Sequence, residues 1–476
     1  MHLDERLSLF LKISLPLIFL IAVRAYPRPY TVVDAYRAAL SAQAFGQHQA
    51  AASAFRMVVE YEPWRSTLWE TIGQEELAAG KLPQAIQALK QAERAGVLSA
   101  GGQLQLGDAY LQQREDGQAE ATWQALLIKR GPSADIYERL EQVQRTRRDY
   151  TAVVATLRNW HAFSPQDAHV TFLLGMALSP QQPEQALPLL MEAAQKDASY
   201  TAQVQTLRSG LGLAANASDP AYGWLMIGRS LASINQWDLA VEAFQRCVEL
   251  SPQYAEAWAF LGEARYHLDG TGKTELDRAV ELNPQSPVVR ALLALYWRRL
   301  GEPDKALPYL EAIAQQEPEE PTWQVEIGNT LVEFGDLETA QAAFQKAIEL
   351  APNNAIYYQY MARFSVQYNV DIRGVGLPAA RQAVLIASDD PGSLDAMGWT
   401  MAALGDSASA ERFLQRALDR DATYAPALLH LGQLFLQQQD SGKAHPFLQR
   451  AASQAGDNPT AVVARRLLKR YYGEGG

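Results

Sequence analysis

The sequence predicts an all-α fold: an α-α superhelix of about twelve helix-turn-helix repeats, closed by one C-terminal helix. The chain has 476 residues, more than a single compact core usually organises. Ala, Leu and Gln are plentiful while Val and Ile are sparse, which favours helix over strand. From residue 32 onward, small and large apolar residues recur with a period of 34, which indicates stacked helical repeats.

Residues 1–31 precede the repeats and contain an apolar run from Leu7 to Val23. The run is just long enough for a bilayer span and includes a core that suits a signal peptide, so both interpretations stay open. Acidic Asp4 before the run, and Arg24 inside the only suitable cleavage site, favour a retained membrane anchor. We expect the bulk of the chain outside the cytoplasm, with secretion or periplasmic release after cleavage as the alternative.

Repeats 1–5 are expected in residues 32–199 and repeats 6–12 in residues 221–458. Between them, residues 200–220 lack the repeat pattern and are expected to form a connecting helix and loop. Residues 459–476 read as an amphipathic capping helix with a basic end and a short tail. The predicted first residues of the repeats are Val32, Ser66, Ala100, Ala134, Ala168, Ala221, Ala255, Pro287, Pro321, Ala355, Pro391 and Ala425.

The pattern within one repeat is clearest after residue 221. Positions 4, 7, 8, 11, 20, 24, 27 and 32 are occupied by Trp224, Ile227, Gly228, Leu231, Ala240, Phe244, Cys247 and Pro252. This series resembles the tetratricopeptide repeat, which has Trp, Leu-Gly, Tyr, Ala, Phe, Ala and Pro at those positions. Small residues at 8, 20 and 27 would let helices approach closely, and large residues at 4, 7, 11 and 24 would fill the remaining space.

Glycine and proline mark the predicted helix boundaries. Position 15 is glycine in five repeats and is expected just past the first helix, where φ is often positive; these are Gly46, Gly80, Gly301, Gly335 and Gly405. Pro188, Pro308 and Pro446 are expected in the first turn of a second helix, where the backbone amide has no helical partner.

Composition and motifs argue against most chemistries. With a net charge of −11, the chain lacks the excess of lysine and arginine that is typical of nucleic-acid-binding proteins. The single cysteine and seven scattered histidines form no metal-ligand spacing, and no phosphate-binding or nucleophile motif occurs. We therefore expect no catalytic residues, no bound cofactor or metal, and no enzymatic activity.

The resemblance implies that first-helix positions 2, 5, 9, 12 and 13 line a concave groove that binds other proteins. Carried over to this chain, they give eight groove residues: Tyr222, Arg229, Glu263, Arg298, Arg299, Asn329, Arg363 and Trp399. Four arginines with only Glu263 opposing them would suit an acidic segment or a C-terminal carboxylate. The alternative is that these arginines are solvated or pair with neighbouring carboxylates.

The same positions in residues 32–199 are more apolar and would suit an amphipathic helix; they include Tyr36, Leu40, Leu104, Leu111, Phe172 and Met176. The chain lacks the lysine and asparagine set with which some members of the family clamp a terminal carboxylate. The sequence as a whole predicts a membrane-tethered scaffold or adaptor that assembles other proteins. The alternative is an exported envelope component for polysaccharide or protein secretion.

Overall fold

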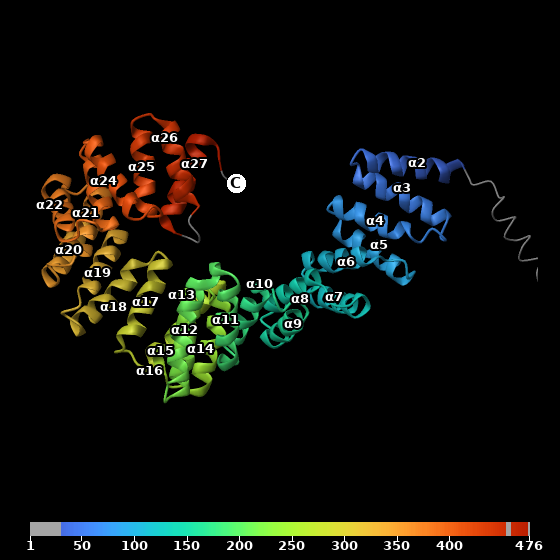
Figure 1. The fold of residues 1–476 in the computed structure, drawn as a ribbon, viewed down its shortest axis with the longest axis horizontal. Coiled ribbons are helices and arrows are strands. Elements are labelled where there is room, and N and C mark those ends of the chain that lie inside the picture. Colours follow the sequence, from blue (N-terminus) through green and yellow to red (C-terminus); the bar gives the residue numbers. More distant parts are fainter. Residues whose placement is uncertain (1–29, 454–457, 475–476) are drawn as a thin grey trace, which may run out of the picture. The chain divides into compact units, whose positions relative to one another are not determined.

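The computed structural model describes residues 30–453 and 458–474, and the regular structure in these ranges is entirely helical. The predicted all-α repeat fold is confirmed (Figure 1). Within the described residues, no helix combines the length and apolar character needed to cross a membrane. The predicted anchor from Leu7 to Val23 lies outside the described ranges and stays a prediction.

The chain divides into two compact bodies, one extending to Leu239 and the other from Ala240 to Gly476. From residue 30 onward, the N-terminal body contains five helix pairs and then α12, an extra helix that packs on α13 and lies in the predicted connecting segment. Its helices are α2 (Tyr30–Ala44), α3 (His48–Tyr61), α4 (Leu68–Ala78), α5 (Leu82–Arg94), α6 (Ala100–Gln112), α7 (Asp116–Arg130), α8 (Ala134–Thr146), α9 (Tyr150–Phe163), α10 (Ala168–Leu178), α11 (Pro183–Lys196), the 3₁₀ turn η1 (Ala198–Tyr200), α12 (Thr201–Ala215) and α13 (Pro220–Ser233).

The boundary between the bodies falls inside α14 (Trp237–Leu250). The C-terminal body continues with helix pairs and ends with the predicted capping helix, α27. Its helices are α15 (Ala255–Asp269), α16 (Lys273–Leu282), α17 (Pro287–Arg299), α18 (Pro303–Gln316), α19 (Pro321–Phe334), α20 (Leu337–Leu350), α21 (Ala355–Gln367), the π turn η2 (Ile372–Gly376), α22 (Leu377–Ile386), α23 (Pro391–Ala403), α24 (Ser407–Arg420), α25 (Ala425–Gln437), α26 (Ser441–Ala452) and α27 (Pro459–Tyr472).

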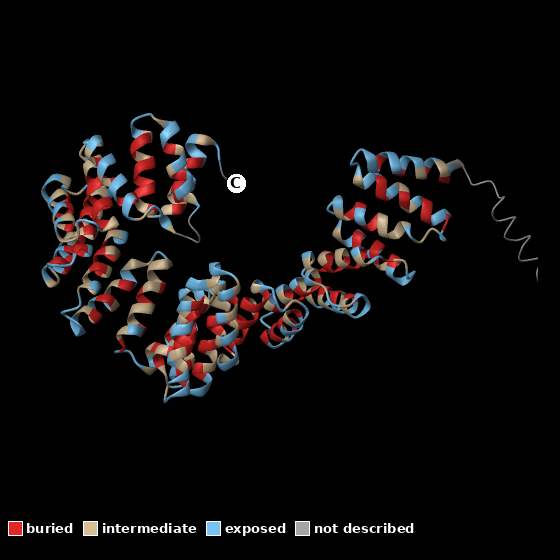
Figure 2. Cartoon of the chain, in the orientation of Figure 1, coloured by how far each residue is buried: buried red, intermediate tan, exposed pale blue. Residues whose placement is uncertain are grey.

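A glycine at repeat position 8 sets the distance between the two helices of a repeat. In Gly107, an added Cβ would lie 2.1 Å from Nε1 of the buried Trp123 on the second helix. The same contact joins Gly328 to Phe344, with 2.8 Å to the ring. It recurs with leucine as the partner in five more repeats, at Gly73, Gly175, Gly262, Gly398 and Gly432. The buried residues consequently face one another within each helix pair (Figure 2).

Position 15 has the left-handed backbone conformation far more often than its glycines alone predicted. The five predicted glycines have φ between 67° and 91°. The equivalent non-glycine residues also have positive φ, between 54° and 62°; they are Arg114, Arg148, Asn235, Asn369 and Gln439. The turn between the helices therefore requires this conformation whether or not the residue is glycine.

The interpretation of the three prolines is wrong. Pro188, Pro308 and Pro446 each stand sixth in their helix, in the second turn, where the residue four positions earlier loses a hydrogen-bond donor. Each proline and the residue four positions before it are exposed. The helix continues because water can reach the carbonyl group that the proline leaves without a partner.

One contact in the N-terminal body joins helices that are not neighbours in the array. Arg145 of α8 donates from Nε to Oδ2 of Asp238 at 2.6 Å, and from Nη2 to its Oδ1 at 3.1 Å. Tyr150 donates its hydroxyl to the same carboxylate at 3.1 Å. Burial by itself would raise the pKa of Asp238, but these bonds outweigh it and lower the pKa. The contact spans 93 residues and joins the fourth predicted repeat to the sixth, whereas repeats usually contact only their neighbours.

The left-handed turns predict an asymmetric response to glycine substitution. Arg114→Gly and Gln439→Gly should each raise the free energy of unfolding by about 0.5–1 kcal/mol, because a side chain at positive φ is strained. Gly301→Ala should lower it by about 1 kcal/mol for the same reason. Urea unfolding followed by circular dichroism measures all three, and equal effects of both kinds of substitution would contradict the assignment of the turn.

Candidate functional site

The eight predicted groove residues are divided between the two bodies. Tyr222 and Arg229 lie exposed on α13 in the N-terminal body. The other six lie in the C-terminal body, where they form two ion-paired clusters and line two pockets.

Arg299 and Glu263 form the first cluster. Nη1 of Arg299 donates to both carboxylate oxygens of Glu263 at 2.8 Å, and its guanidinium lies over the ring of Tyr266. Nε2 of His267 is 3.2 Å from Oε1 of the same carboxylate. Glu263 is buried, so this arginine is neutralised by an acid that contacts little water.

Arg298 forms the second cluster by joining two carboxylates of the next repeat. Its Nη2 and Nε bond the two oxygens of Glu333 at 2.7 and 3.2 Å, and its Nη1 bonds Glu326 at 2.7 Å. Burial lowers the pKa of Arg298, but the two carboxylates outweigh burial and raise it. All three nitrogens of this guanidinium are therefore engaged within the chain.

The first pocket lies between α19 and α21 and has a volume of about 310 Å³. Three of the predicted residues line it together: Arg298, Asn329 and Arg363. Its apolar lining includes Phe344 and Phe364. In the described part of the chain, the side-chain amide of Asn329 forms no hydrogen bond.

Arg363 stands beside a buried acid at the edge of this pocket. Its Nη2 donates to the hydroxyl of Tyr424 at 2.8 Å and lies 3.6 Å from Oδ2 of Asp395. Asp395 is fully buried, and its Oδ1 is 2.7 Å from Nδ1 of His430. Burial lowers the pKa of Arg363, but Asp395 outweighs it and raises the pKa, so the guanidinium remains charged.

Trp399 lines the second pocket, of about 270 Å³, between α23 and α25. Its ring stacks on His430 with 4.3 Å between centroids. Gln367 lines both pockets, so they follow one another along the first helices of neighbouring repeats. Gln433 and Gln437 add amide groups to the second pocket.

The expectation that only Glu263 opposes the arginines is wrong, because Glu326, Glu333 and Asp395 also lie beside them. Two of these could have been found from the sequence. Glu333 occupies groove position 13 and Asp395 occupies groove position 5 of their repeats. Glu326 stands at position 6 of its repeat, which is not one of the groove positions. The family pattern therefore gives no indication that it contacts an arginine of the groove.

Two of the six apolar groove residues predicted in the N-terminal body, Phe172 and Met176, are buried. Phe172 stacks on Tyr200 of η1, with 4.3 Å between ring centroids. The segment before α12 therefore covers part of the apolar surface that was predicted for a partner.

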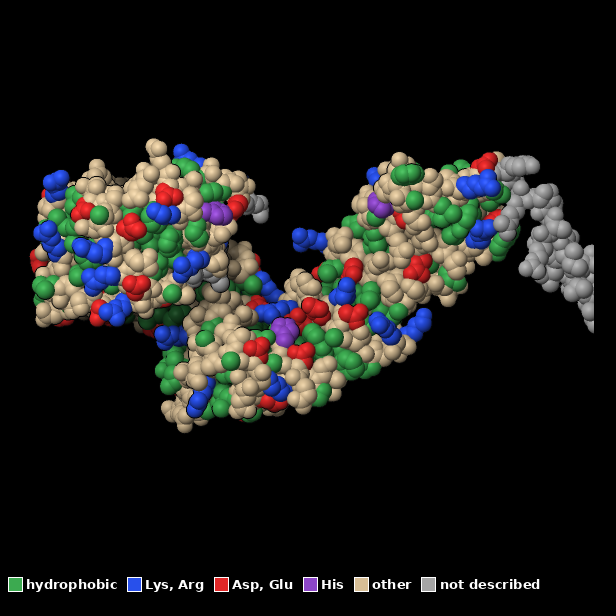
Figure 3. All heavy atoms as spheres, turned by 45° about the horizontal axis from the view of Figure 1, so that its top comes forward, with side chains coloured by type: hydrophobic (Ala, Val, Ile, Leu, Met, Phe, Trp, Pro, Cys, Tyr) green, Lys and Arg blue, Asp and Glu red, His purple; other side chains and the backbone are tan. Residues whose placement is uncertain are grey.

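The described residues on one face of the molecule form no extended region of one charge (Figure 3). On the face shown in Figure 3, basic and acidic side chains are interspersed over both bodies. Among the described residues, no group of three or more His, Cys, Asp or Glu side chains is arranged to hold a metal ion.

Family models match much of the chain. Two models, both described as tetratricopeptide repeat, match residues 71–135 and 225–287, and residues 298–364 and 401–466. Together these segments make up more than half of the sequence.

Several solved structures resemble this one. Yeast Tom70 is 14% identical, with 92% of this chain and 95% of that one covered and a TM-score of 0.43. A tetratricopeptide repeat protein from Parabacteroides merdae is 15% identical, with 52% and 97% covered and a TM-score of 0.43. YrrB, described as having an unusual peptide-binding site, is 19% identical, with 40% and 97% covered and a TM-score of 0.27.

The Glu263 cluster predicts a pH dependence of stability. Burial, and then the charge of Arg299, lower the pKa of His267, although Glu263 partly offsets them. Above about pH 6.5 the imidazole of His267 is neutral in both the folded and the unfolded state. Below it the unfolded state takes up a proton that folded His267 resists, so stability falls until the pH passes the folded pKa.

His267→Gln should remove this contribution. Urea unfolding of wild type and variant at pH 7.5 and pH 5.5 measures the difference. Wild type should lose more stability than the variant on acidification, and equal losses would contradict the assignment.

Proposed function

Because this chain belongs to the tetratricopeptide repeat family, we propose that it is a non-enzymatic scaffold that binds other proteins through the groove of its C-terminal body. The repeats support this, since proteins built from them generally mediate protein interactions and complex assembly. We assign the main contact to the pocket between α19 and α21 and its partner to an acidic segment or a C-terminal carboxylate.

The observation that carries this proposal is the unequal use of the arginine donors. Arg298 has all three nitrogens bonded to carboxylates of the chain. Arg363 uses only Nη2, and no described residue accepts a hydrogen bond from its Nε or Nη1. Its side chain remains 30% exposed, so these donors can reach a ligand in the pocket.

The pocket offers complementary groups for a peptide. A carboxylate could accept two bonds from Arg363, which a guanidinium provides in a fixed geometry. The amide of Asn329 could bond the peptide backbone, while Phe344 and Phe364 provide apolar contact. Glu333 lines the same pocket, but Arg298 neutralises it and so limits its repulsion of an acidic partner.

Arg363→Gln should weaken partner binding by roughly 10- to 100-fold, because a hydrogen bond to a charged group contributes about 1.5–3 kcal/mol. Arg381→Gln is the matched control, since Arg381 is an exposed arginine of α22 that lines neither pocket. Partners recovered by crosslinked pull-down are identified, purified and titrated against wild type and both variants. Equal affinity for wild type and Arg363→Gln would exclude this pocket as the contact.

We also propose that Leu7 to Val23 tethers the scaffold to a membrane, with the repeats outside the cytoplasm. The apolar run and the acidic residues before it support a retained anchor over a cleaved signal. In the alternative, cleavage releases an exported component that serves polysaccharide or protein secretion.

The two cases differ in the mature N-terminus and in fractionation. With a retained anchor, intact-mass analysis should show the residues before Val23, and the protein should remain with the membrane in carbonate washes. Replacing Leu17 and Phe19 with Asp should release it, because each charge opposes insertion by about 2.5–3.5 kcal/mol. A mature chain that begins near residue 26 would instead establish cleavage.

A further inference from the structure

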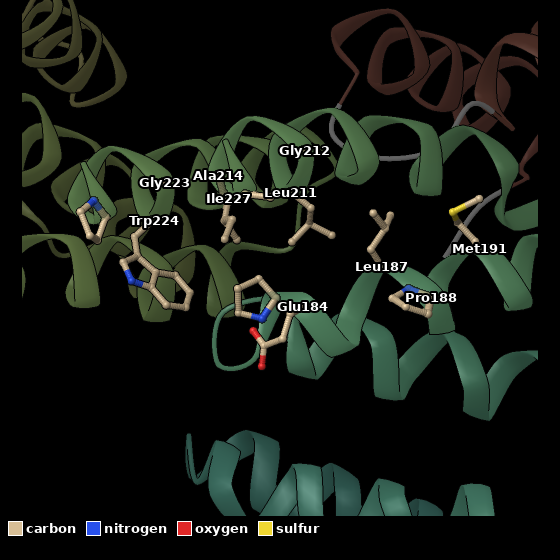
Figure 4. Close-up of a pocket in the computed structure, with 13 residues that line it drawn as sticks. Glu184, Leu187, Pro188, Met191, Leu211, Gly212, Ala214, Gly223, Trp224 and Ile227 are labelled. Carbon is tan, nitrogen blue, oxygen red and sulfur yellow. The ribbon is translucent and has the colours of Figure 1, made fainter. Parts of the chain in front are cut away.

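A third pocket lies in the N-terminal body. Its residues are far along the sequence from the groove arginines of the C-terminal body. It has a volume of about 760 Å³ and lies between α11 on one side and α12 and α13 on the other. Figure 4 shows Leu187 and Met191 of α11 pointing towards the helix that carries Leu211, with Trp224 and Ile227 at the end of the pocket away from Met191. The volume falls in the range of about 300–1,000 Å³ that is typical of ligand-binding pockets.

The pocket exists because α12 interrupts the pairing of helices. Elsewhere in this body each second helix is followed by the first helix of a new pair, but α11 is followed by the extra helix α12. α12 packs closely on α13 at Gly210, where an added Cβ would lie 2.0 Å from Oγ of Ser230. Nearby, Gly223 of α13 lies at ordinary van der Waals distance from Ala214 of α12. α12 also packs against α11, yet Leu187 and Met191 of α11 keep part of their surface exposed beside it.

The uncovered side chains are of kinds that a partner helix can contact closely. Met191 is 38% exposed and Leu187 is half-buried, although both are apolar. The lining on α12 includes the small residues Gly212 and Ala215, which let another backbone approach. Such a surface suits the apolar face of an amphipathic helix.

One charge at the pocket indicates the sign of the partner. Among the described residues that line the pocket, Glu184 is the only charged one. It is exposed, and no described residue forms an ion pair or hydrogen bond with its carboxylate. Figure 4 shows Glu184 at the pocket, on the side where Trp224 and Ile227 lie. A partner that covers the pocket would leave this carboxylate unpaired unless it brings a cation.

We propose that this pocket binds a basic amphipathic helix of a partner protein. Its apolar side chains pack between Leu187, Met191 and Trp224, and a lysine or arginine on the same helix pairs with Glu184. This site does not depend on the groove around Arg363. It selects a basic partner, whereas the groove is proposed to bind an acidic one. The protein would then hold two partners of different chemistry at separate places on one chain.

The test uses the full chain and two fluorescent 14-residue helical peptides. One has leucine at positions i, i+3, i+4 and i+7 with lysine elsewhere, and the other has glutamate in place of lysine. Fluorescence anisotropy should show the lysine peptide binding at least tenfold more tightly than the glutamate peptide. Equal binding of the two peptides would overturn the proposal, because Glu184 would then select nothing.

Variants place the binding in the pocket. Met191→Asp should weaken binding of the lysine peptide at least tenfold, whereas Leu213→Asp should leave that affinity unchanged. Leu213 is the matched control, because it is an exposed leucine of α12 that does not line the pocket. Glu184→Lys should reverse the preference between the peptides. Both Met191 and Glu184 reach solvent, so these variants should keep the circular dichroism spectrum and urea midpoint of wild type.

Other occupants give different results. Dodecyltrimethylammonium binding as tightly as the lysine peptide, and competing with it, would overturn the proposal in favour of a small cationic amphiphile. Self-association that Met191→Asp abolishes, without peptide binding, would overturn it in favour of a second copy of the chain. Loss of binding in Arg363→Gln would also contradict the independence of the two sites, whereas failure of the acidic-partner test alone would leave this site intact.

Discussion

The contact between the glycine at position 8 and the large side chain at position 24 is the constraint on which the rest of the structure depends. Because Gly107 has no side chain, the indole of Trp123 can lie directly against its backbone, and the first and second helices meet closely. Seven repeats share this arrangement. In the C-terminal body, first helices of successive repeats also contact one another, as α15 does with α17 and α21 with α23, and the groove residues lie on these helices.

The electrostatics of the groove follow from that spacing. First helices of neighbouring repeats are close enough for Arg298 of α17 to reach Glu326 and Glu333 of α19, and for Arg299 of α17 to reach back to Glu263 of α15. In a chain of charge −11, most arginines of the groove find such a partner. Arg363 differs because its nearest acid, Asp395, is buried and also engages His430. Arg363 also lines the pocket, and no described residue accepts a hydrogen bond from its Nε or Nη1.

The N-terminal body departs from the regular array at α12, which belongs to no repeat. A regular array covers each second helix with the next pair, so its apolar residues serve the core. There α12 packs closely on α13 at Gly210, and α11 keeps part of its apolar surface exposed with Glu184 beside it. The break in the repeat thereby coincides with an apolar pocket.

The sequence by itself determined the helical repeats, because the 34-residue pattern records which residues must be small for helices to meet. It indicated α6 and α8 starting at Ala100 and Ala134, and it named Arg298, Asn329 and Arg363, which line one pocket. It could not determine which arginines remain available, because their partners lie about 30 residues away and depend on how long side chains reach across helices. The pocket at α12 was likewise decided only by the tertiary structure, since it depends on how α11, α12 and α13 pack on one another outside the repeat pattern.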